Sequence, residues 1–470
     1  MTTSNKKGIS RRKFLGQANC AAIGSTTLFS SLLNLAMSNR VAASVPASEY
    51  RALVCVLLGG GNDSYNMLSP LESAEYNAYK SIRGDLALDS STADLTPLPI
   101  SDQGGRAFGI HPGMPEVRDL YNSGDLAFLA NTGTLVRPTT LSMYNNGTDL
   151  PLALFSHSDQ ISHWQTSVPD RRLNAGSEIG KGWGGRTADL LHSLNDSNQV
   201  SMNISVSGHN IFQTGQQIVP YGISDSGGLI LDGHGGSSDI DIARTSAIAS
   251  QLDLMYSNLF EKTFVNNSKS SLDAALYYQS VIDANPISVD MSDSNLEKDL
   301  KIVARSIKAA STLGHKRQTF FISAGGWDHH DNTIGNQAGM LPMVSKAVKK
   351  FRDAMVEIGM MDKVTLFQTS DFGRTLTTNS QGSDHAWGGN YLVMGGGVNG
   401  GDVYGDYPDF TNLAPIDTGR GRLIPSTSVD EYVSELIQWF GVPASELETV
   451  LPNIGNFPNG SQARPIGFLA

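Results

Sequence analysis

The chain has 470 residues and carries 45 acidic against 34 basic side chains, which gives a formal net charge of −11 at neutral pH. An acidic surface repels nucleic-acid phosphates and anionic lipid headgroups, so we expect neither nucleic acid nor a membrane surface as a partner. The length suits two domains or one large α/β domain.

The first 43 residues show the order of features typical of a twin-arginine export signal. Residues 10–15 read SRRKFL, a weakly apolar stretch covers residues 21–37, and small residues lead to Ala43. We therefore predict export by the twin-arginine translocase, cleavage after Ala43 and a periplasmic or secreted protein. A stable membrane anchor fits less well, because the apolar stretch is short and contains many Ser and Thr residues.

Loss of this leader changes the charge and the cysteine content. The leader holds six basic and no acidic residues, so the mature chain keeps 28 basic against 45 acidic residues and a net charge of about −17. Cys20 leaves with the leader and Cys55 remains, which excludes an intrachain disulfide. The excess of carboxylates suits a protein that binds cations.

Apolar runs and helical patterns alternate along the mature chain. This order predicts one α/β domain over residues 44–470, with a largely parallel central sheet and helices on both faces. Residues 207–295, which include a polar patch and then helical segments, are expected to form an insertion or cap over the sheet. The expected strands are 52–58, 126–131, 200–206, 319–323, 364–369 and 391–394, and the expected helices are 115–122, 296–313 and 340–358.

Polar side chains gather where these strands end. Asp63 follows the first strand, residues 327–332 (WDHHDN) follow the fourth, and Asp371 and Arg374 follow the fifth; His385 lies just before the sixth. Because ligands bind at the carboxyl ends of parallel strands, we expect these side chains to converge at one edge of the sheet. Asp and His side chains together suit a divalent ion such as Zn²⁺, Mn²⁺ or Fe²⁺, whereas a polar turn is the alternative for the WDHHDN segment.

An ordered series of short motifs resembles the DUF1501 family, which is similar to the alkaline phosphatase/sulfatase superfamily. The resemblance covers most of the mature chain and implies an alkaline phosphatase-like α/β fold with a metal centre that acts on small phosphate or sulfate esters. The motifs are LLGGGND (57–63), SHSDQISHWQT (156–166), GWGGR (182–186), GGWDHH (325–330), SDFGRT (370–375), GSDH (382–385) and a tail over 419–439 that begins GRGRLIP.

The same resemblance implies the metal ligands. Asp63 is similar to the metal-binding acid after the first strand, and Asp328 and His330 to the acid and histidine of one metal position. Asp371 is similar to the acid of the second position and His385 to the late histidine of the first. The cofactor implied is a divalent ion: Zn²⁺, Mn²⁺ or Ca²⁺.

The catalytic groups are less certain to assign, and alternatives stay open for each. Ser156 is the expected nucleophile, activated by the ion, with Ser158 as a rival and a helix-capping role as the alternative for both. His157 and His163 would transfer protons or complete the metal shell, or lie at the surface. Arg374 would bind the anionic group of a substrate, or pair with a neighbouring acid.

Two departures from the superfamily pattern bear on activity. Phe372 stands where a histidine usually follows the second acid, and His330 is two rather than four residues after Asp328, with Asn332 at the fourth position. A single ion is therefore an alternative to a pair. Two functions follow: a metal-dependent hydrolase of phosphate or sulfate esters, or a non-catalytic binding or assembly protein that keeps the fold.

Overall fold

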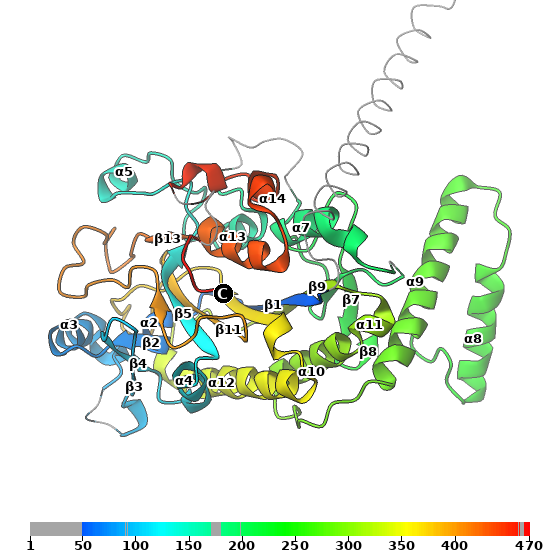
Figure 1. The fold of residues 1–470 in the computed structure, drawn as a ribbon, viewed down its shortest axis with the longest axis horizontal. Helices are drawn as coiled ribbons and strands as arrows, with labels where there is room; N and C mark the ends of the chain where they lie inside the picture. The colour runs from blue at the N-terminus through cyan, green and yellow to red at the C-terminus, as the bar shows by residue number, and fades with distance from the viewer. Residues whose placement is uncertain are drawn as a thin grey trace, which may run out of the picture.

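The computed structural model describes residues 49–470 except residues 90, 92, 171–179, 198, 459 and 461–464. The expected export signal and its cleavage position lie outside the described residues. The described chain folds around one ten-stranded sheet with helices on either side, and a separate sheet of three short strands lies beside it (Figure 1).

The large sheet has the strand order β12-β5-β11-β10-β1-β9-β6-β7-β8, and β13 pairs with β5. Pairing is parallel from β10 through β1, β9 and β6 to β7, whereas β11 is antiparallel to both of its neighbours. The predicted largely parallel sheet is thus confirmed. Its strands are β1 (Arg51–Leu58), β5 (Leu126–Gly133), β6 (Asn203–Ser205), β7 (Tyr221–Ser224), β8 (Gly227–Gly228), β9 (Arg317–Ala324), β10 (Val364–Ser370), β11 (Gly389–Gly395), β12 (Val403–Tyr404) and β13 (Thr427–Ser428).

Strand β1 shows why the sheet needs helices on both faces. Side chains alternate between the two faces of a strand, so successive residues of β1 pack into two different apolar cores, one on each face of the sheet. Ala52, Val54 and Val56 join one apolar cluster, whereas Leu53 and Cys55 join the other. Cys55 is a buried free thiol. A strand that is apolar on both sides is stable only when both faces are covered.

The two cores are closed by different helices, which confirms the prediction of helices on both faces (Figure 1). One face carries α4 (Pro115–Asn122), α10 (Asn295–Lys308) and α12 (Thr333–Glu357), and the other carries α7 (Trp183–Leu191), α13 (Val429–Phe440) and α14 (Leu447–Val450). Helix α12 begins at Thr333, earlier than predicted, and contains Pro342, whose ring packs on Gly113. The remaining α-helices are α2 (Ser64–Met67), α3 (Ser73–Arg83), α5 (Leu141–Asn145), α6 (His157–Thr166), α8 (Asp239–Leu252), α9 (Leu259–Asp283) and α11 (Ala310–Leu313).

The expected insertion at residues 207–295 contributes β7, β8, α8 and α9. Helix α9 packs the residues near its end, such as Tyr278 and Ile282, against the body, whereas α8 has no buried residue. Both helices project beside the β8 end of the sheet (Figure 1). That this segment is an insertion in a single domain stays a prediction.

The small sheet has the order β2-β4-β3, formed by β2 (Leu68–Pro70), β3 (Leu98–Ser101) and β4 (Ala107–Ile110).

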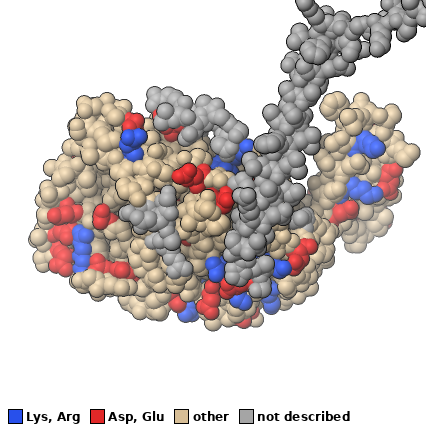
Figure 2. Space-filling model, turned by 45° about the horizontal axis from the view of Figure 1, so that its top comes forward, with Lys and Arg blue, Asp and Glu red and all other residues tan. Residues whose placement is uncertain are grey.

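On the face drawn in Figure 2, acidic and basic side chains are scattered among neutral ones, and the described residues there form no broad basic patch. No helix among the described residues is both long and apolar enough to cross a membrane.

Candidate metal centre

The loops after three neighbouring strands meet at one edge because the strands are parallel. Leu58, the last residue of β1, pairs with Ala324 at the end of β9 and with Ser370 at the end of β10. Backbone bonds then join the loops: the Trp327 amide donates to the Gly59 carbonyl at 3.1 Å. This register carries the side chains that follow β9 and β10 to the same place.

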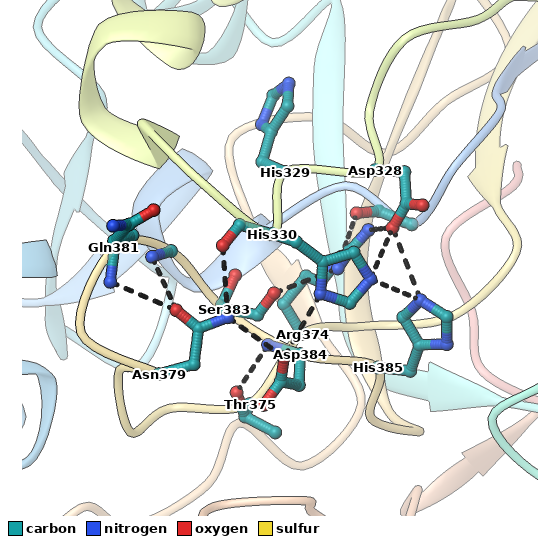
Figure 3. Close-up of polar contacts among 12 residues, drawn as sticks. Asp328, His329, His330, Arg374, Thr375, Asn379, Gln381, Ser383, Asp384 and His385 are labelled. Carbon is teal, nitrogen blue, oxygen red and sulfur yellow. Dashed lines mark hydrogen bonds and ion pairs between the residues drawn. The ribbon is translucent and has the colours of Figure 1, made fainter.

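Three imidazoles and one carboxylate point at a common position there. Nε2 of His385 lies 3.0 Å from Nε2 of His157 and 2.9 Å from Nε2 of His330. Oδ1 of Asp328 lies 3.1 Å from Nε2 of His330 and 3.3 Å from Nε2 of His385, and its Oδ2 lies 3.5 Å from Nε2 of His157. Figure 3 shows His330, His385 and Asp328 facing one another, while His329 points away. We call these four converging side chains the His/Asp cluster.

The far nitrogen of each imidazole in the cluster has its own acceptor. Nδ1 of His157 lies 2.7 Å from the Asp371 carboxylate, Nδ1 of His385 lies 2.7 Å from the Phe155 carbonyl, and Nδ1 of His330 lies 3.1 Å from the Asp384 carboxylate. A carbonyl and an ionised carboxylate only accept, so each Nδ1 is the donor, and the Nε2 of a neutral ring presents a lone pair. Burial lowers the pKa of His385, which favours its neutral form.

These tautomers decide what the cluster can hold. With neutral rings, Nε2 lone pairs and a carboxylate face one another at hydrogen-bond distance. A positive charge among these acceptors, either a bound ion or a proton on one ring, offsets their repulsion. A tetrahedral ion with bonds of about 2.0–2.1 Å keeps its ligand atoms about 3.3 Å apart. The ligand atoms of His157, Asp328 and His385 all lie within 4.8 Å of one another, and His330 stands beside this trio. Second acceptors that fix the tautomer are also the usual surroundings of metal-bound histidines. His157, Asp328 and His385 satisfy the geometric criterion for a metal site.

Arg374 binds the Asp328 carboxylate and the backbone around the cluster, and its guanidinium is not free to bind a substrate. Its guanidinium is fully buried and donates to the carbonyls of Gly61 (2.8 Å), Ser383 (3.0 Å) and Gly60 (2.6 Å), and it also pairs with Oδ1 of Asp328. A buried guanidinium needs acceptors of this kind. Of the two roles considered for Arg374, the structure shows the ion pair with an acid. Burial works to raise the pKa of Asp328, but the bond and the charge of Arg374 outweigh it, so that this pKa is lowered.

Asp63 does not reach the cluster, contrary to the expectation of a free carboxylate at the end of the first strand. Its side chain is fully buried and pairs with Arg83 at 2.8 Å, and it accepts a hydrogen bond from Ser383 Oγ at 3.0 Å. A buried carboxylate requires such a countercharge. The sequence contains no signal for this pairing, because Arg83 lies at the end of helix α3 among ordinary surface-type residues.

Asp371 and the two departures from the superfamily pattern also find their places. Asp371 is buried and holds His157, and its other oxygen accepts from the Gly60 amide at 3.0 Å. The ring of Phe372 packs on His157 and His385 at centroid distances of 4.8 and 4.7 Å, so an apolar wall stands where a second histidine was expected. Asn332 is the residue before helix α12.

Ser156 is not a member of the His/Asp cluster, but its neighbour Phe155 contacts His385 and its neighbour His157 belongs to the cluster. Ser156 precedes helix α6, and its hydroxyl donates to Asp159 at 2.7 Å and lies 3.4 Å from the Ser158 hydroxyl. Phe155 adopts a left-handed φ of 73°, a strained conformation for a bulky residue. Strain of this kind is typical of functional sites, and here Phe155 directs its carbonyl to His385. His163 is buried within α6 and is absent from the cluster.

Asp384 is the supporting residue that sequence reasoning missed, although it lies inside the GSDH motif. It accepts from Asn379 at 3.0 Å and pairs with Arg420 at 2.6 Å, in addition to holding His330. Burial acts against ionisation, but these partners prevail and lower the pKa of Asp384 to about 2. The position of Asp384 next to His385 in the GSDH motif is the feature of the sequence from which its role could have been predicted.

Comparison with known proteins gives one family and several distant structures. Residues 50–416 match the profile of a family described as a protein of unknown function, DUF1501. No curated protein matches the chain. One similar solved structure is the C-terminal periplasmic domain of EcEptC from Escherichia coli (10% identity, TM-score 0.33, covering 85% of this chain and 84% of that chain). Others, also at 10% identity, are the PsFucS1 sulfatase from Pseudoalteromonas sp. (0.35, 88% and 72%) and the soluble domain of lipooligosaccharide phosphoethanolamine transferase A from Neisseria meningitidis (0.35, 91% and 94%).

Proposed function

This chain belongs to the DUF1501 family, and we propose that it is a metal-dependent hydrolase of phosphate or sulfate esters with one divalent ion in the His/Asp cluster. The observation that carries the proposal is the convergence of three Nε2 atoms and a carboxylate, all acceptors, within 2.9–3.5 Å of a neighbour. The imidazole nitrogens of His157 and His385, with the Asp328 carboxylate and His330 beside them, favour Zn²⁺ over Mn²⁺ and Ca²⁺, which prefer oxygen ligands.

The surrounding residues hold the ligands in position. Asp371, Asp384 and the Phe155 carbonyl each fix one imidazole with its Nε2 turned inward, and Arg374 fixes the carboxylate of Asp328. When bound, a divalent ion supplies Lewis acidity, which stabilises negative charge on an ester oxygen and lowers the pKa of an adjacent hydroxyl group. Phe372 excludes water from one side of His157 and His385.

We assign the nucleophile to Ser156, the residue between Phe155 and His157. Its hydroxyl donates to Asp159, so that this carboxylate is placed to accept the proton as the hydroxyl oxygen attacks the phosphorus or sulfur atom. The bond from that atom to the alcohol oxygen of the ester then breaks, the alcohol leaves with a proton from solvent, and water hydrolyses the serine ester to release phosphate or sulfate. The alternative nucleophile is a water molecule. Ser156→Ala separates the two, because a serine mechanism loses turnover while the metal content stays the same.

Elemental analysis of the purified chain tests the proposal, together with hydrolysis of aryl phosphate and aryl sulfate esters. We expect one zinc ion per chain, lost in His385→Ala and kept in His209→Ala. His209 is a matched control because it is exposed and its Nε2 contacts only the Thr214 hydroxyl, at 3.5 Å. A wild-type chain that holds no ion after exposure to Zn²⁺ contradicts the metal site. A chain that holds zinc but cleaves neither ester is the non-catalytic binding protein instead.

We further propose that the protein reaches the periplasm through the twin-arginine translocase. The support is the sequence of residues 10–15, which contains the arginine pair Arg11-Arg12. A lysine pair keeps the charge but does not reproduce the planar guanidinium groups. The double variant Arg11→Lys, Arg12→Lys should leave the precursor in the cytoplasm. Normal accumulation of this variant in the periplasm contradicts the proposal, and cell fractionation measures it.

A further inference from the structure

The anionic group of a phosphate or sulfate ester is commonly bound by an arginine side chain. Arg374 does not serve here, because its buried guanidinium already binds Asp328 and backbone carbonyls. The GRGRLIP motif supplies arginines at the same edge. It lies in a tight turn in which the Asp417 carboxylate accepts from the amides of Gly419 (2.8 Å) and Gly421 (2.9 Å), and Asp417 forms a bridge with Leu423. The turn therefore has a defined shape and holds Arg420 and Arg422 beside the cluster.

The two arginines of this turn differ in what they bind. Arg420 pairs with Asp384 at 2.6 Å, and Asp384 holds His330, so Arg420 positions a metal ligand. Arg422 donates through Nε to the carbonyl of His385 at 3.0 Å, and its guanidinium carbon lies 5.1 Å from the centre of the Phe155 ring. Arg422 thus contacts a cluster histidine and the residue whose carbonyl orients that histidine.

The terminal nitrogens of Arg422 are available. Within the described part of the chain, no hydrogen bond or ion pair uses them, while the side chain is half-buried. The Nε bond and the Phe155 ring together hold the guanidinium plane in one orientation, so little side-chain entropy is lost when the two terminal nitrogens bind a ligand. A planar fork with two free donors matches two oxygens of a phosphate or sulfate group.

We propose that Arg422 binds the anionic group of the ester at the metal centre through its two terminal nitrogens. This inference rests on the proposed function and adds the residue that recognises the substrate class. It also accounts for the buried state of Arg374: one arginine holds the metal-binding carboxylate, and a different one contacts the substrate.

The test is binding of inorganic phosphate to the zinc-loaded protein, measured by calorimetry beside the zinc content of each variant. Arg422→Gln should keep one zinc per chain and weaken phosphate binding about 10- to 100-fold, as expected for the loss of hydrogen bonds to a charged group. Arg422→Lys keeps the charge without the fork and should fall between the two. Arg118→Gln, at an exposed pair with Asp119, is the control and should bind phosphate like the wild type.

Three outcomes separate this inference from the proposed function. Phosphate binding by Arg422→Gln within twofold of the wild type, at unchanged zinc content, overturns the role of Arg422 alone. Zinc-loaded wild type that binds no phosphate overturns it as well and leaves the metal site intact. A wild type that takes up no zinc removes both. If Arg422→Gln does not fold, the same criteria apply to Arg422→Lys, and a rise in KM at constant kcat is the matching kinetic result.

Discussion

Asp63 and Asp328 follow two neighbouring parallel strands, yet their carboxylates are balanced in different ways. Asp63 is fully buried and pairs with Arg83, whose side chain is also fully buried. The side chain of Asp328 is 46% exposed and faces the Nε2 atoms of three imidazoles. The protein thus carries its own cation for the inner acid, whereas it gathers acceptors around the outer one. Under the proposed function, the outer position takes its cation from solution.

The cost of burial explains this division. A carboxylate taken out of water must be paired, and Arg83 provides that pairing permanently. Arg374 balances Asp328 but contacts none of the three Nε2 atoms among the described residues. Changes at each position should therefore have distinct signatures: loss of folding stability at the inner pair, and loss of metal affinity at the outer cluster.

The largest effect is expected from breaking the inner pair. Arg83→Met should lower the free energy of unfolding by about 3–5 kcal/mol, because it leaves a buried charge without its partner. Zn²⁺ should not restore the loss. Denaturant unfolding measures it, with Arg118→Met as the control at an exposed pair, where a change of only about 0.5 kcal/mol is expected. Equal losses in the two variants would show that Asp63 does not depend on Arg83.

A third acid extends the comparison to a carboxyl group that is balanced by a proton. Asp430 is buried and has no cationic partner among the described residues; it contacts Ser167 and accepts from Asn453 at 3.2 Å, and burial raises its pKa to about 6. Because this pKa lies above the unfolded value near 4, the stability it contributes is complete below about pH 4 and is lost as the pH rises through about 6. Asp430→Asn should remove this dependence.

The expected size follows from the shift. Between pH 4 and pH 7.5, the stability of the wild type should fall relative to Asp430→Asn by about 3 kcal/mol. Urea unfolding across that pH range measures the difference. Parallel stability curves for the two proteins would place the titration of Asp430 outside this window.

Metal binding at the outer cluster should stabilise the fold by a comparable but concentration-dependent amount. At a free Zn²⁺ concentration of 100 times the dissociation constant, the gain should be about 2.7 kcal/mol. A chelator should reverse it, and His385→Ala should abolish it. Thermal unfolding with and without Zn²⁺ measures the shift. The same shift in His385→Ala would assign the binding to another site.

The smallest effect is expected one step outside the ligands. Asp371→Asn should weaken zinc affinity about 10- to 100-fold while keeping the fold, because Asp371 orients His157 and raises its basicity without binding the ion. Competition with a chromogenic chelator measures the affinity, and Asp119→Asn on α4 is the control. Complete loss of zinc in Asp371→Asn would make Asp371 a direct ligand, as the family resemblance implies.

Much of the framework was determined by local patterns in the sequence. Apolar runs with flanking glycines predicted β1, β5, β9, β10 and β11, because strands buried on both faces must be apolar throughout. Parallel strands then required that the residues after β9 and β10 meet at one edge. That requirement is why the sequence predicts that Asp328 and Asp371 lie near one another at one edge of the sheet.

The tertiary structure alone decided which partner each charged side chain takes. Arg83 with Asp63, Arg374 with Asp328, and Arg422 with His385 join residues that are 20, 46 and 37 positions apart. Such pairings depend on side-chain direction and on how closely loops approach, and neither leaves a periodic trace in the sequence. His157 is the clearest case. Asp371 binds its Nδ1, so that only Nε2 can point into the cluster. The strained backbone at Phe155 lies two residues before it.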